Sequence, residues 1–317
     1  MSPLSNELTE GVRRGDVRAL ARAISIVEDG LPEAPALLAA LFPHAGRSLV
    51  VGVTGPPGSG KSTLVDRLTA RLRRDGKTVA IVAVDPTSPF SGGAILGDRI
   101  RMQGHAADEG VFIRSMATRG HLGGLAAATG HVLTVLSAAG KDVILVETVG
   151  VGQDEVEIVD AADVSVVVLV PGLGDDIQAL KAGIMEIADV FVVNKADRDG
   201  VDRAVAEIES MLSLATRDGQ PPPAIVKTVA TEDRGIDELW AAVEAFRARV
   251  AGSGALASRR RAQLQRQLEE TLQERLLRRA RAGALAPAEL EKTVDRLEAR
   301  TLDPLAAAEE VMKRMGL

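Results

Sequence analysis

Gly55-Pro56-Pro57-Gly58-Ser59-Gly60-Lys61-Ser62-Thr63 fits the pattern G-x-x-x-x-G-K-[ST] of phosphate-binding loops. Residues 48–54 before it form a valine-rich run typical of a buried strand, and residues 64–72 after it place apolar side chains on one helical face. The glycines allow backbone N–H groups to turn toward an anion, and the start of the helix adds a partial positive charge. We therefore expect Lys61 to reach the β- and γ-phosphates of a nucleotide and Ser62 to bind Mg²⁺. The alternative, a glycine turn that happens to precede a helix, is disfavoured by the full match and its context.

The composition of the 317 residues is typical of a globular protein, with 46% hydrophobic and 26% charged residues. A net charge of -6 argues against nucleic acid as the main partner, because a phosphate backbone requires a basic protein face. The absence of cysteine excludes disulfides, thiolate metal sites and thiol nucleophiles. The sequence has neither a signal-peptide pattern nor an apolar run of membrane-spanning length, so we expect no membrane partner and a cytoplasmic location.

Residues 48–252 alternate between apolar runs and helical patterns, which predicts an α/β domain. The runs lack the polar alternation of half-exposed strands, so we expect the P-loop NTPase architecture, a mainly parallel sheet covered by helices on both faces. Ligands of such sheets bind at the carboxyl ends of the strands. The residues expected at that edge are Lys61, Asp85, Glu147 and Asn194. The predicted strands are Leu49–Thr54, Thr78–Val84, Val111–Ser115, Asp142–Glu147, Val164–Val170, Val190–Asn194 and Ala224–Val229.

Two helical extensions are predicted to flank this domain. Residues 1–47 carry apolar side chains at helical spacing and are interpreted as a helical cap on the main domain. Beyond a short break, residues 253–317 form an arginine- and leucine-rich helical arm. One apolar stripe runs along it, formed by Leu264, Leu268, Leu272 and Leu276. The stripe either docks on its own domain or joins two chains, and its length and position after a linker favour a dimerisation arm.

Asn194-Lys195-Ala196-Asp197 follows an apolar strand and matches the N-K-x-D pattern of GTP-binding proteins. A carboxylate at Asp197 can accept hydrogen bonds from N1–H and the N2 amino group of guanine, and adenine offers neither donor there. A site built around such an acceptor rejects the base that leaves it unpaired. Asn194 is expected to support guanine N7 and to tie this loop to the phosphate-binding loop. The tetrapeptide predicts GTP and GDP as ligands; the alternative, a charged turn after a strand, is disfavoured by the motif upstream.

Three acidic residues are candidates for a Mg²⁺ site. Glu147 follows an apolar strand, where P-loop enzymes hold Mg²⁺, and Asp85 ends another. Asp98 lies in a glycine-rich segment that suits a switch ordered by the Mg²⁺-nucleotide, although alone it would be interpreted as an ordinary loop carboxylate. We expect Ser62 and Asp98 to hold the ion. The other two carboxylates are expected to act from its water shell.

Together these segments resemble the MeaB/ArgK family of P-loop GTPases, the bacterial relatives of the human methylmalonic aciduria type A protein. The resemblance covers nearly the whole central domain, whereas the helical extensions agree in layout only. The segment around Glu147 is a more specific sign of the family than the phosphate-binding loop. The segments concerned are 55–63, 84–88, 92–99, 121–124, 144–153, 171–184 and 194–197.

The resemblance implies a GTPase chaperone for an adenosylcobalamin-dependent acyl-CoA mutase, with methylmalonyl-CoA mutase as the first candidate. Members of the family gate the loading of the cobalamin cofactor and protect or reactivate the mutase. They are homodimers that associate through the C-terminal arm. For this chain the resemblance therefore implies GTP or GDP and Mg²⁺ as cofactors, and a mutase and a second copy as partners.

The resemblance also implies roles for particular residues. Lys61, Asp98 and Glu147 are the expected catalytic residues, with Asp98 in the first switch and Glu147 as the Walker B acid. An additional switch is expected to couple the nucleotide state to the mutase, although the solvated start of a helix is the alternative for this segment. Its residues are Asp175, Asp176, Gln178 and Lys181.

The loop that contacts guanine O6 is expected at residues 228–231. Val229 departs there from the small and polar residues usual in the family. A contact from a backbone N–H needs no particular side chain. Ala230 is therefore kept as the expected O6 contact.

Two other functions stay open from the sequence. One is a kinase acting on a periplasmic amino-acid transport-system protein, a role with which the family has also been associated. It requires a phospho-acceptor site, which the sequence does not reveal. The other is a nickel-insertion GTPase, against which the missing cysteine and the missing histidine-rich tract count.

Overall fold

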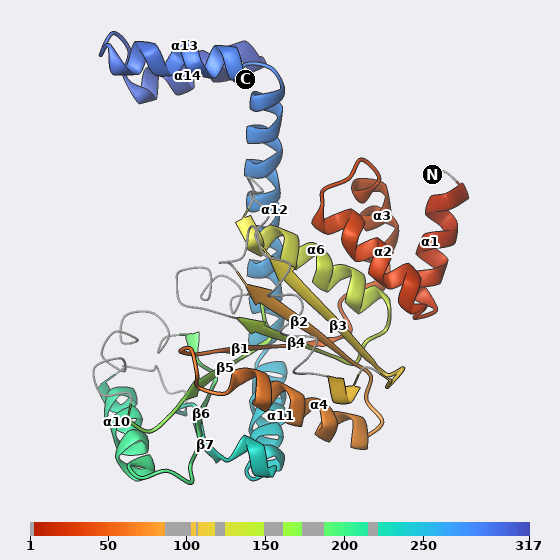
Figure 1. Cartoon of the computed structure of the whole chain (residues 1–317), viewed down its shortest axis with the longest axis vertical. Helices are drawn as coiled ribbons and strands as arrows, with labels where there is room; N and C mark the ends of the chain where they lie inside the picture. Colours follow the sequence, from red (N-terminus) through yellow and green to blue (C-terminus); the bar gives the residue numbers. More distant parts are fainter. Residues whose placement is uncertain are drawn as a thin grey trace.

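The computed structural model describes residues 3–85, 103–105, 107–117, 124–148, 161–172, 187–214 and 221–317. A seven-stranded sheet lies at its centre in the order β3-β2-β4-β1-β5-β6-β7, and neighbouring strands are parallel (Figure 1). The α/β prediction is confirmed, and the described strands pair in parallel throughout. They are β1 (Leu49–Thr54), β2 (Val79–Asp85), β3 (Val111–Ala117), β4 (Val143–Thr148), β5 (Val164–Leu169), β6 (Val190–Asn194) and β7 (Ala224–Thr228).

Helices cover both faces of the sheet, which is why β4, β5 and β6 are buried at every position. Side chains alternate between the two cores along a strand, so that Val166 of β5 joins one core and Val167 the other. Strands buried on both faces require continuous apolar runs rather than alternating ones. The valine-rich character of the predicted strands therefore follows from their position in the sheet.

The first face is covered by α4 (Lys61–Arg74) and α11 (Ile236–Gly252), which bury Leu64 and Trp240 against the strands. The second face is covered by α6 (Gly124–Ala138) and, over β5 and β6, by α10 (Val201–Leu214). Two single turns complete the described elements of this region, η2 (Gln103–His105) and η4 (Ala230–Glu232). The sheet is thus the middle of three layers.

Residues 3–44 form helices, as predicted for this extension, and these helices pack against α6. They are α1 (Pro3–Arg13), α2 (Val17–Glu28), α3 (Ala34–Leu41) and the turn η1 (Phe42–His44). Asp16 begins α2 by accepting a hydrogen bond from the Ala19 N–H at 2.7 Å. Leu20, Ile24 and Leu37 are almost fully buried in the core shared with α6.

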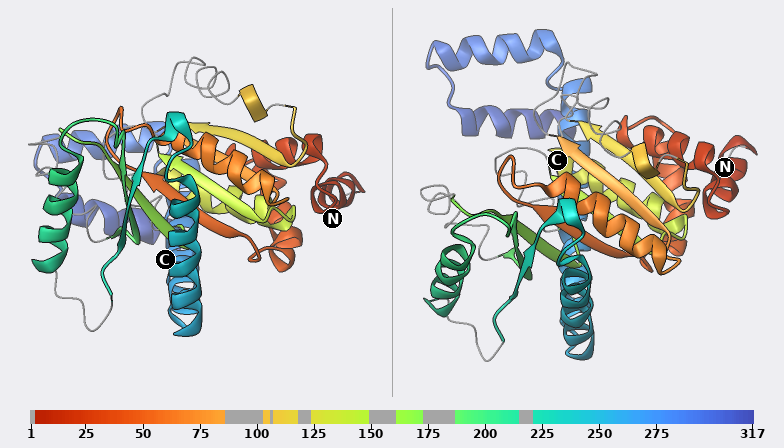
Figure 2. Two further views of the ribbon diagram at one scale, coloured as in Figure 1. Left: turned by 90° about the horizontal axis from the view of Figure 1, so that it is seen from below. Right: turned by 60° about the horizontal axis from the view of Figure 1, so that its bottom comes forward.

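The C-terminal arm consists of α12 (Ala255–Ala282), α13 (Pro287–Glu298) and α14 (Pro304–Met315). Helix α12 passes the sheet and α6 and carries α13 and α14 beyond the rest of the molecule (Figures 1 and 2). An ion pair between Arg296 and Glu310 joins these last two helices at 2.8 Å. Within the described residues, no helix combines the length and the apolar character needed to cross a bilayer.

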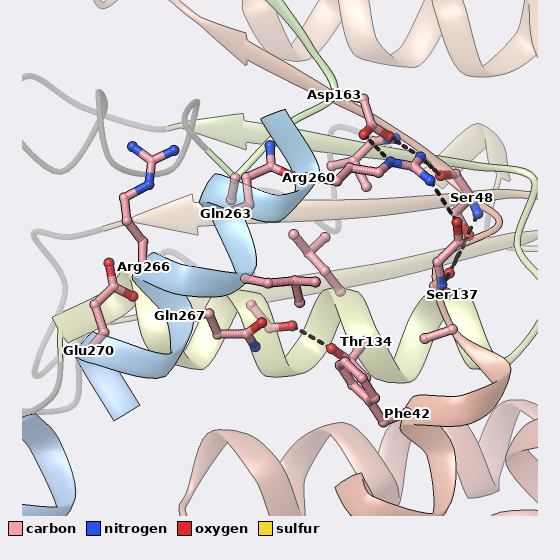
Figure 3. Close-up of a pocket in the computed structure, with 17 residues that line it drawn as sticks. Phe42, Ser48, Thr134, Ser137, Asp163, Arg260, Gln263, Arg266, Gln267 and Glu270 are labelled. Atoms are coloured by element: carbon pink, nitrogen blue, oxygen red, sulfur yellow. Dashed lines mark hydrogen bonds and ion pairs between the residues drawn. The ribbon is translucent and has the colours of Figure 1, made fainter. Parts of the chain in front are cut away.

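Two consecutive arginines bind the start of α12 to the sheet. Arg260 donates to both carboxylate oxygens of Asp163, at 2.7 and 2.8 Å (Figure 3). Arg259 donates to both oxygens of Asp189, at 2.6 and 2.9 Å. The aspartates directly precede β5 and β6, so the base of the arm is held at the amino-terminal edge of these strands.

Candidate nucleotide-binding site

The phosphate-binding loop follows β1, the strand from which the sheet extends in both directions. Strands β2, β3 and β4 lie on one side of β1, and β5, β6 and β7 on the other. Residues 55–60 leave the carboxyl end of β1 and lead into α4, which begins at Lys61. Ligands of open parallel sheets bind at such a point. The predicted position of the site at this edge agrees with the topology.

Two glycines of the loop are required by close approaches. Gly55 has a φ of +144°, and a Cβ there would lie 2.1 Å from the carbonyl oxygen of Val168. Gly60 has a φ of +91°, and a Cβ there would lie 2.4 Å from Nδ2 of Asn194. A side chain at either position would force the loop away from β5 or from the 194–197 segment. The glycines thus let three segments meet at one place.

Lys61 is held against the loop that it follows. The residue is 7% exposed. Its Nζ donates hydrogen bonds to the carbonyl oxygens of Gly55 at 2.6 Å and Pro56 at 3.2 Å. These bonds set the ammonium at the start of α4, beside the backbone that would surround a phosphate. Ser59 Oγ in the same loop is buried and has no hydrogen-bond partner in the described part of the chain. The loop therefore holds a fixed cation and a buried polar group, as a phosphate site requires.

Ser62 and Glu147 meet directly. The Ser62 hydroxyl donates to Oε1 of Glu147 at 2.5 Å, and Glu147 is 2% exposed at the end of β4. The next residue, Thr148, donates to the hydroxyl of Thr54 at the end of β1, at 3.0 Å. A hydroxyl beside a buried carboxylate is a set of hard oxygen donors, which is the chemistry that Mg²⁺ prefers. The residues present therefore fit the predicted Mg²⁺ site.

Asn194 joins the loop to the guanine motif. It is 3% exposed, and its Nδ2 donates to the carbonyl of Ser59 at 2.8 Å. Its Oδ1 accepts from the Thr228 hydroxyl at 3.0 Å and from the Ala230 N–H at 3.2 Å. The predicted tie between the two motifs is thus present, and it extends to the segment after β7. Because the Ala230 amide donates to Asn194 in this structure, its contact with guanine O6 stays a prediction.

Lys195 adds a second tie. It adopts a left-handed backbone with φ of 57°, and its Nζ donates to the carbonyl of Gly58 at 2.6 Å. The Ala196 N–H donates to the carbonyl of Thr228 at 3.0 Å, which fixes the turn on β7. Asp197 follows on this fixed turn and is exposed. Its carboxylate is therefore exposed and accessible to the guanine base of a nucleotide.

Several predicted site residues lie outside the described part of the chain. Asp85 ends β2, whose neighbour β4 ends in Glu147 and Thr148, but its side chain is not described. The others outside the description are Asp98, Asp175, Asp176, Gln178 and Lys181. Their roles stay predictions.

The pair Thr54 and Thr148 was missed from the sequence. The two residues end adjacent strands, and their hydroxyls lie 3.0 Å apart beside the loop. A threonine immediately before a phosphate-binding loop is the only signal that could have pointed to it. Its partner depends on β4 lying next to β1, which motif spacing does not indicate.

Replacing Gly60 with alanine is expected to disturb nucleotide binding more than replacing Gly58. Both glycines have positive φ, but a Cβ at Gly58 meets nothing within 4 Å. The Gly60→Ala methyl group would displace the Asn194 amide from Ser59, which we expect to cost about 1–3 kcal/mol beyond the backbone strain that both variants share. Urea unfolding and GDP titration of the two variants measure the difference. Equal losses would contradict the contact between Gly60 and Asn194.

Comparison with known proteins agrees with this geometry. The family model described as "Methylmalonyl Co-A mutase-associated GTPase MeaB" matches residues 20–284. A putative GTPase of Pyrococcus abyssi is 47% identical over 313 residues, which cover 98% of this chain and 96% of the relative. GTPase ArgK of Escherichia coli is 41% identical over 278 residues, 83% of this chain and 84% of that protein.

Two further similarities extend the comparison. The mitochondrial methylmalonic aciduria type A homolog of Mus musculus is 34% identical over 290 residues, 86% of this chain and 70% of that protein. The crystal structure titled LAO/AO transport system kinase has a TM-score of 0.73 and 30% identity, covering 100% of this chain and 99% of the other. With the nucleotide site described above, these matches make the chain a GTPase. It belongs to the MeaB family of methylmalonyl Co-A mutase-associated GTPases.

Proposed function

We propose that this GTPase controls a methylmalonyl-CoA mutase through its nucleotide state, and that it gates the loading of adenosylcobalamin and protects or reactivates that enzyme. The observation that carries the proposal is the match of the family model over residues 20–284, whose description names the mutase. The similarity to the methylmalonic aciduria type A homolog supports it. The direct hydrogen bonds between the phosphate-binding loop and the 194–197 segment support it too, because they hold the two predicted nucleotide motifs together.

In this proposal Lys61 and the loop amides bind the phosphates of GTP and neutralise the charge that develops on them during hydrolysis. Ser62 and Asp98 would hold Mg²⁺, with Asp85 and Glu147 acting through its water shell. When bound, the ion would supply positive charge that offsets the negative charge developing on the phosphates. Asp197 would select guanine, on a turn kept in place by Asn194 and Lys195.

The coupling to the mutase would start beside the site. Glu147 and Thr148 end β4, so the chain that follows this strand begins beside the nucleotide site. The segment between β5 and β6 would carry the coupling, through the predicted switch residues Asp175, Asp176, Gln178 and Lys181. A change between GTP and GDP would bias these segments, as in other nucleotide switches.

The test measures GTP turnover by the purified chain with and without methylmalonyl-CoA mutase, and cobalamin transfer to the apo-mutase. We expect a nucleotide-dependent complex, and turnover raised by about tenfold or more, because partners commonly complete slow GTPase sites. Transfer of cobalamin is expected to require GTP hydrolysis. If the mutase changes neither turnover nor cobalamin transfer, the proposal fails.

A second candidate is a kinase acting on a transport-system protein, because one similar solved structure bears that title. The same preparation discriminates the two functions. GTP labelled at the γ-phosphate is incubated with a periplasmic amino-acid-binding protein and with the mutase. Label transferred to the binding protein favours the kinase, and release as inorganic phosphate favours the GTPase switch.

We also propose that residues 253–317 are a dimerisation arm on the GTPase domain of residues 48–252, with residues 1–47 as its helical cap. The leucine stripe of α12 is left exposed by the single chain: Leu264 is 50%, Leu268 68%, Leu272 54% and Leu276 37% exposed. Leu264 also borders a hollow of about 310 Å³ between α12 and α6, next to the 55% exposed Phe42 (Figure 3). Apolar surface of this kind is typical of a protein interface. A second copy would cover it.

Leu268→Glu is expected to shift the protein from dimer to monomer, because each copy would place a carboxylate in an apolar interface. The matched control is Val17→Glu, which adds the same charge to the 53% exposed start of α2. Sedimentation velocity at equal concentration measures the shift, and GDP binding reports on folding. The arm is not the interface if both variants sediment like the wild-type chain.

A further inference from the structure

A second groove, of about 450 Å³, lies between the α2–α3 connection, α6 and the second half of α12. None of its lining residues belongs to the nucleotide site. The α2–α3 side is mainly apolar, whereas α12 contributes three guanidinium groups. The residues that matter here are Leu31, Pro32, Leu38, Arg275, Arg278 and Arg279. We name this feature the arginine groove.

The charges of the arginine groove do not cancel. Glu28 on its wall is 6% exposed and is bound by Arg114 from β3. Glu274 forms an ion pair with Arg278, one turn along α12. Across the described residues, Arg275 and Arg279 have no ion-pair partner. Among the described residues, the arginine groove therefore carries two guanidinium groups that no carboxylate pairs, in a chain whose net charge is -6.

His131 adds a neutral polar group. It lines the groove from α6, and burial lowers the pKa of its imidazole, although Glu274 opposes the shift. In the described part of the chain its ring nitrogens have no hydrogen-bond partner. The lowered pKa favours the neutral ring, which has one donor and one acceptor available to a ligand.

We propose that the arginine groove binds a small organic polyanion, with its phosphate or carboxylate groups on Arg275 and Arg279 and its apolar part against Leu31 and Leu38. Guanidinium groups bind such anions through paired hydrogen bonds. Arg278 lines the groove between these two arginines and is kept in place by Glu274 and by the carbonyl of Gly30, at 3.4 Å. The volume lies in the range of small-molecule sites, about 300–1,000 Å³.

Two kinds of ligand share this chemistry, a coenzyme A ester and a free nucleotide. Both combine phosphates with a less polar body. The inference does not rest on the mutase partnership, since binding is measured on the isolated full-length chain. If no ligand binds the arginine groove, the proposed function is not contradicted.

The test is calorimetric titration of the full chain, with its phosphate-binding loop first saturated with Mg²⁺ and GDP. The probes are coenzyme A, GDP beyond the first equivalent, and inorganic pyrophosphate. We expect coenzyme A or the second GDP to bind with a Kd below about 1 mM. Whichever of the two binds identifies the source of the anion.

The variant Arg275→Gln/Arg279→Gln is expected to weaken that binding by about tenfold or more, because each change removes a charge-assisted contact. Arg281→Gln is the matched control, since Arg281 is exposed on the same helix but does not line the groove. GTP turnover of all variants should match the wild type. The proposal is overturned if no probe saturates, if the double variant binds as the wild type does, or if pyrophosphate binds as tightly as the organic ligands.

Discussion

Asp197→Asn is expected to lower the affinity for GTP and GDP by about 100-fold or more, because the site would lose the acceptor that guanine requires. The carboxylate accepts from N1–H and from the N2 amino group at once. An amide offers one acceptor and places an NH₂ group where the second donor of guanine points. Xanthine carries a carbonyl at C2, so the same variant is expected to bind xanthosine nucleotides better than the wild type does.

The matched control is Asp199→Asn, because Asp199 is also exposed and lies two residues further along the same connection. Titration of fluorescent GDP, with ATP, GTP and xanthosine triphosphate as competitors, measures the specificity. Only a selective loss of guanine affinity supports the assignment. An equal loss for all bases would place the effect on folding, and no loss would remove Asp197 from the site.

The sequence was sufficient for the strands and for the position of the site. The valine-rich runs predicted β1 and β6 to the residue and the other strands to within two residues. This works because strands buried on both faces must be apolar throughout, so their ends are marked where polar residues begin. The tie between Asn194 and the phosphate-binding loop was also predicted, since both motifs serve one ligand and follow strands of one sheet.

What the sequence did not indicate are contacts that depend on strand order. Nothing in its spacing places β4 beside β1, so the hydrogen bond between Thr148 and Thr54 could not be predicted. The anchoring of the arm is a similar case. Arg260 and Asp163 are 97 residues apart, and each is one charged residue among many. The leucine stripe was predicted, but its exposure required the structure.

Asp163→Ala is expected to lower the free energy of unfolding by about 2–3 kcal/mol, because it leaves several donors without their acceptor. Asp163 is 3% exposed and accepts from Arg260 at 2.7 and 2.8 Å and from the Val50 N–H at 3.0 Å. The hydrogen bond to Asp163 raises the pKa of Arg260. Without that acid the guanidinium still stays charged, because an arginine side chain does not lose its proton in a protein. The expected loss is below the full cost of a broken buried pair, because the Arg260 side chain is 36% exposed and stays bonded to Gly46 and Ser48.

Urea unfolding measures this loss, with Glu207→Ala as the control, because Glu207 pairs with the 85% exposed Arg203 and should cost no more than about 0.5 kcal/mol. The double variant Asp163→Ala/Arg260→Met separates the two causes. Once the cation is gone, the Val50 N–H lacks its acceptor and the carbonyls of Gly46 and Ser48 lose the Arg260 donors. No unpaired charge is left, so the double variant should be more stable than Asp163→Ala alone. If it is instead less stable, Arg260 stabilises the fold without Asp163, through its hydrogen bonds to the carbonyls of Gly46 and Ser48. The base of α12 would then be held to the sheet by these bonds and not by the ion pair alone.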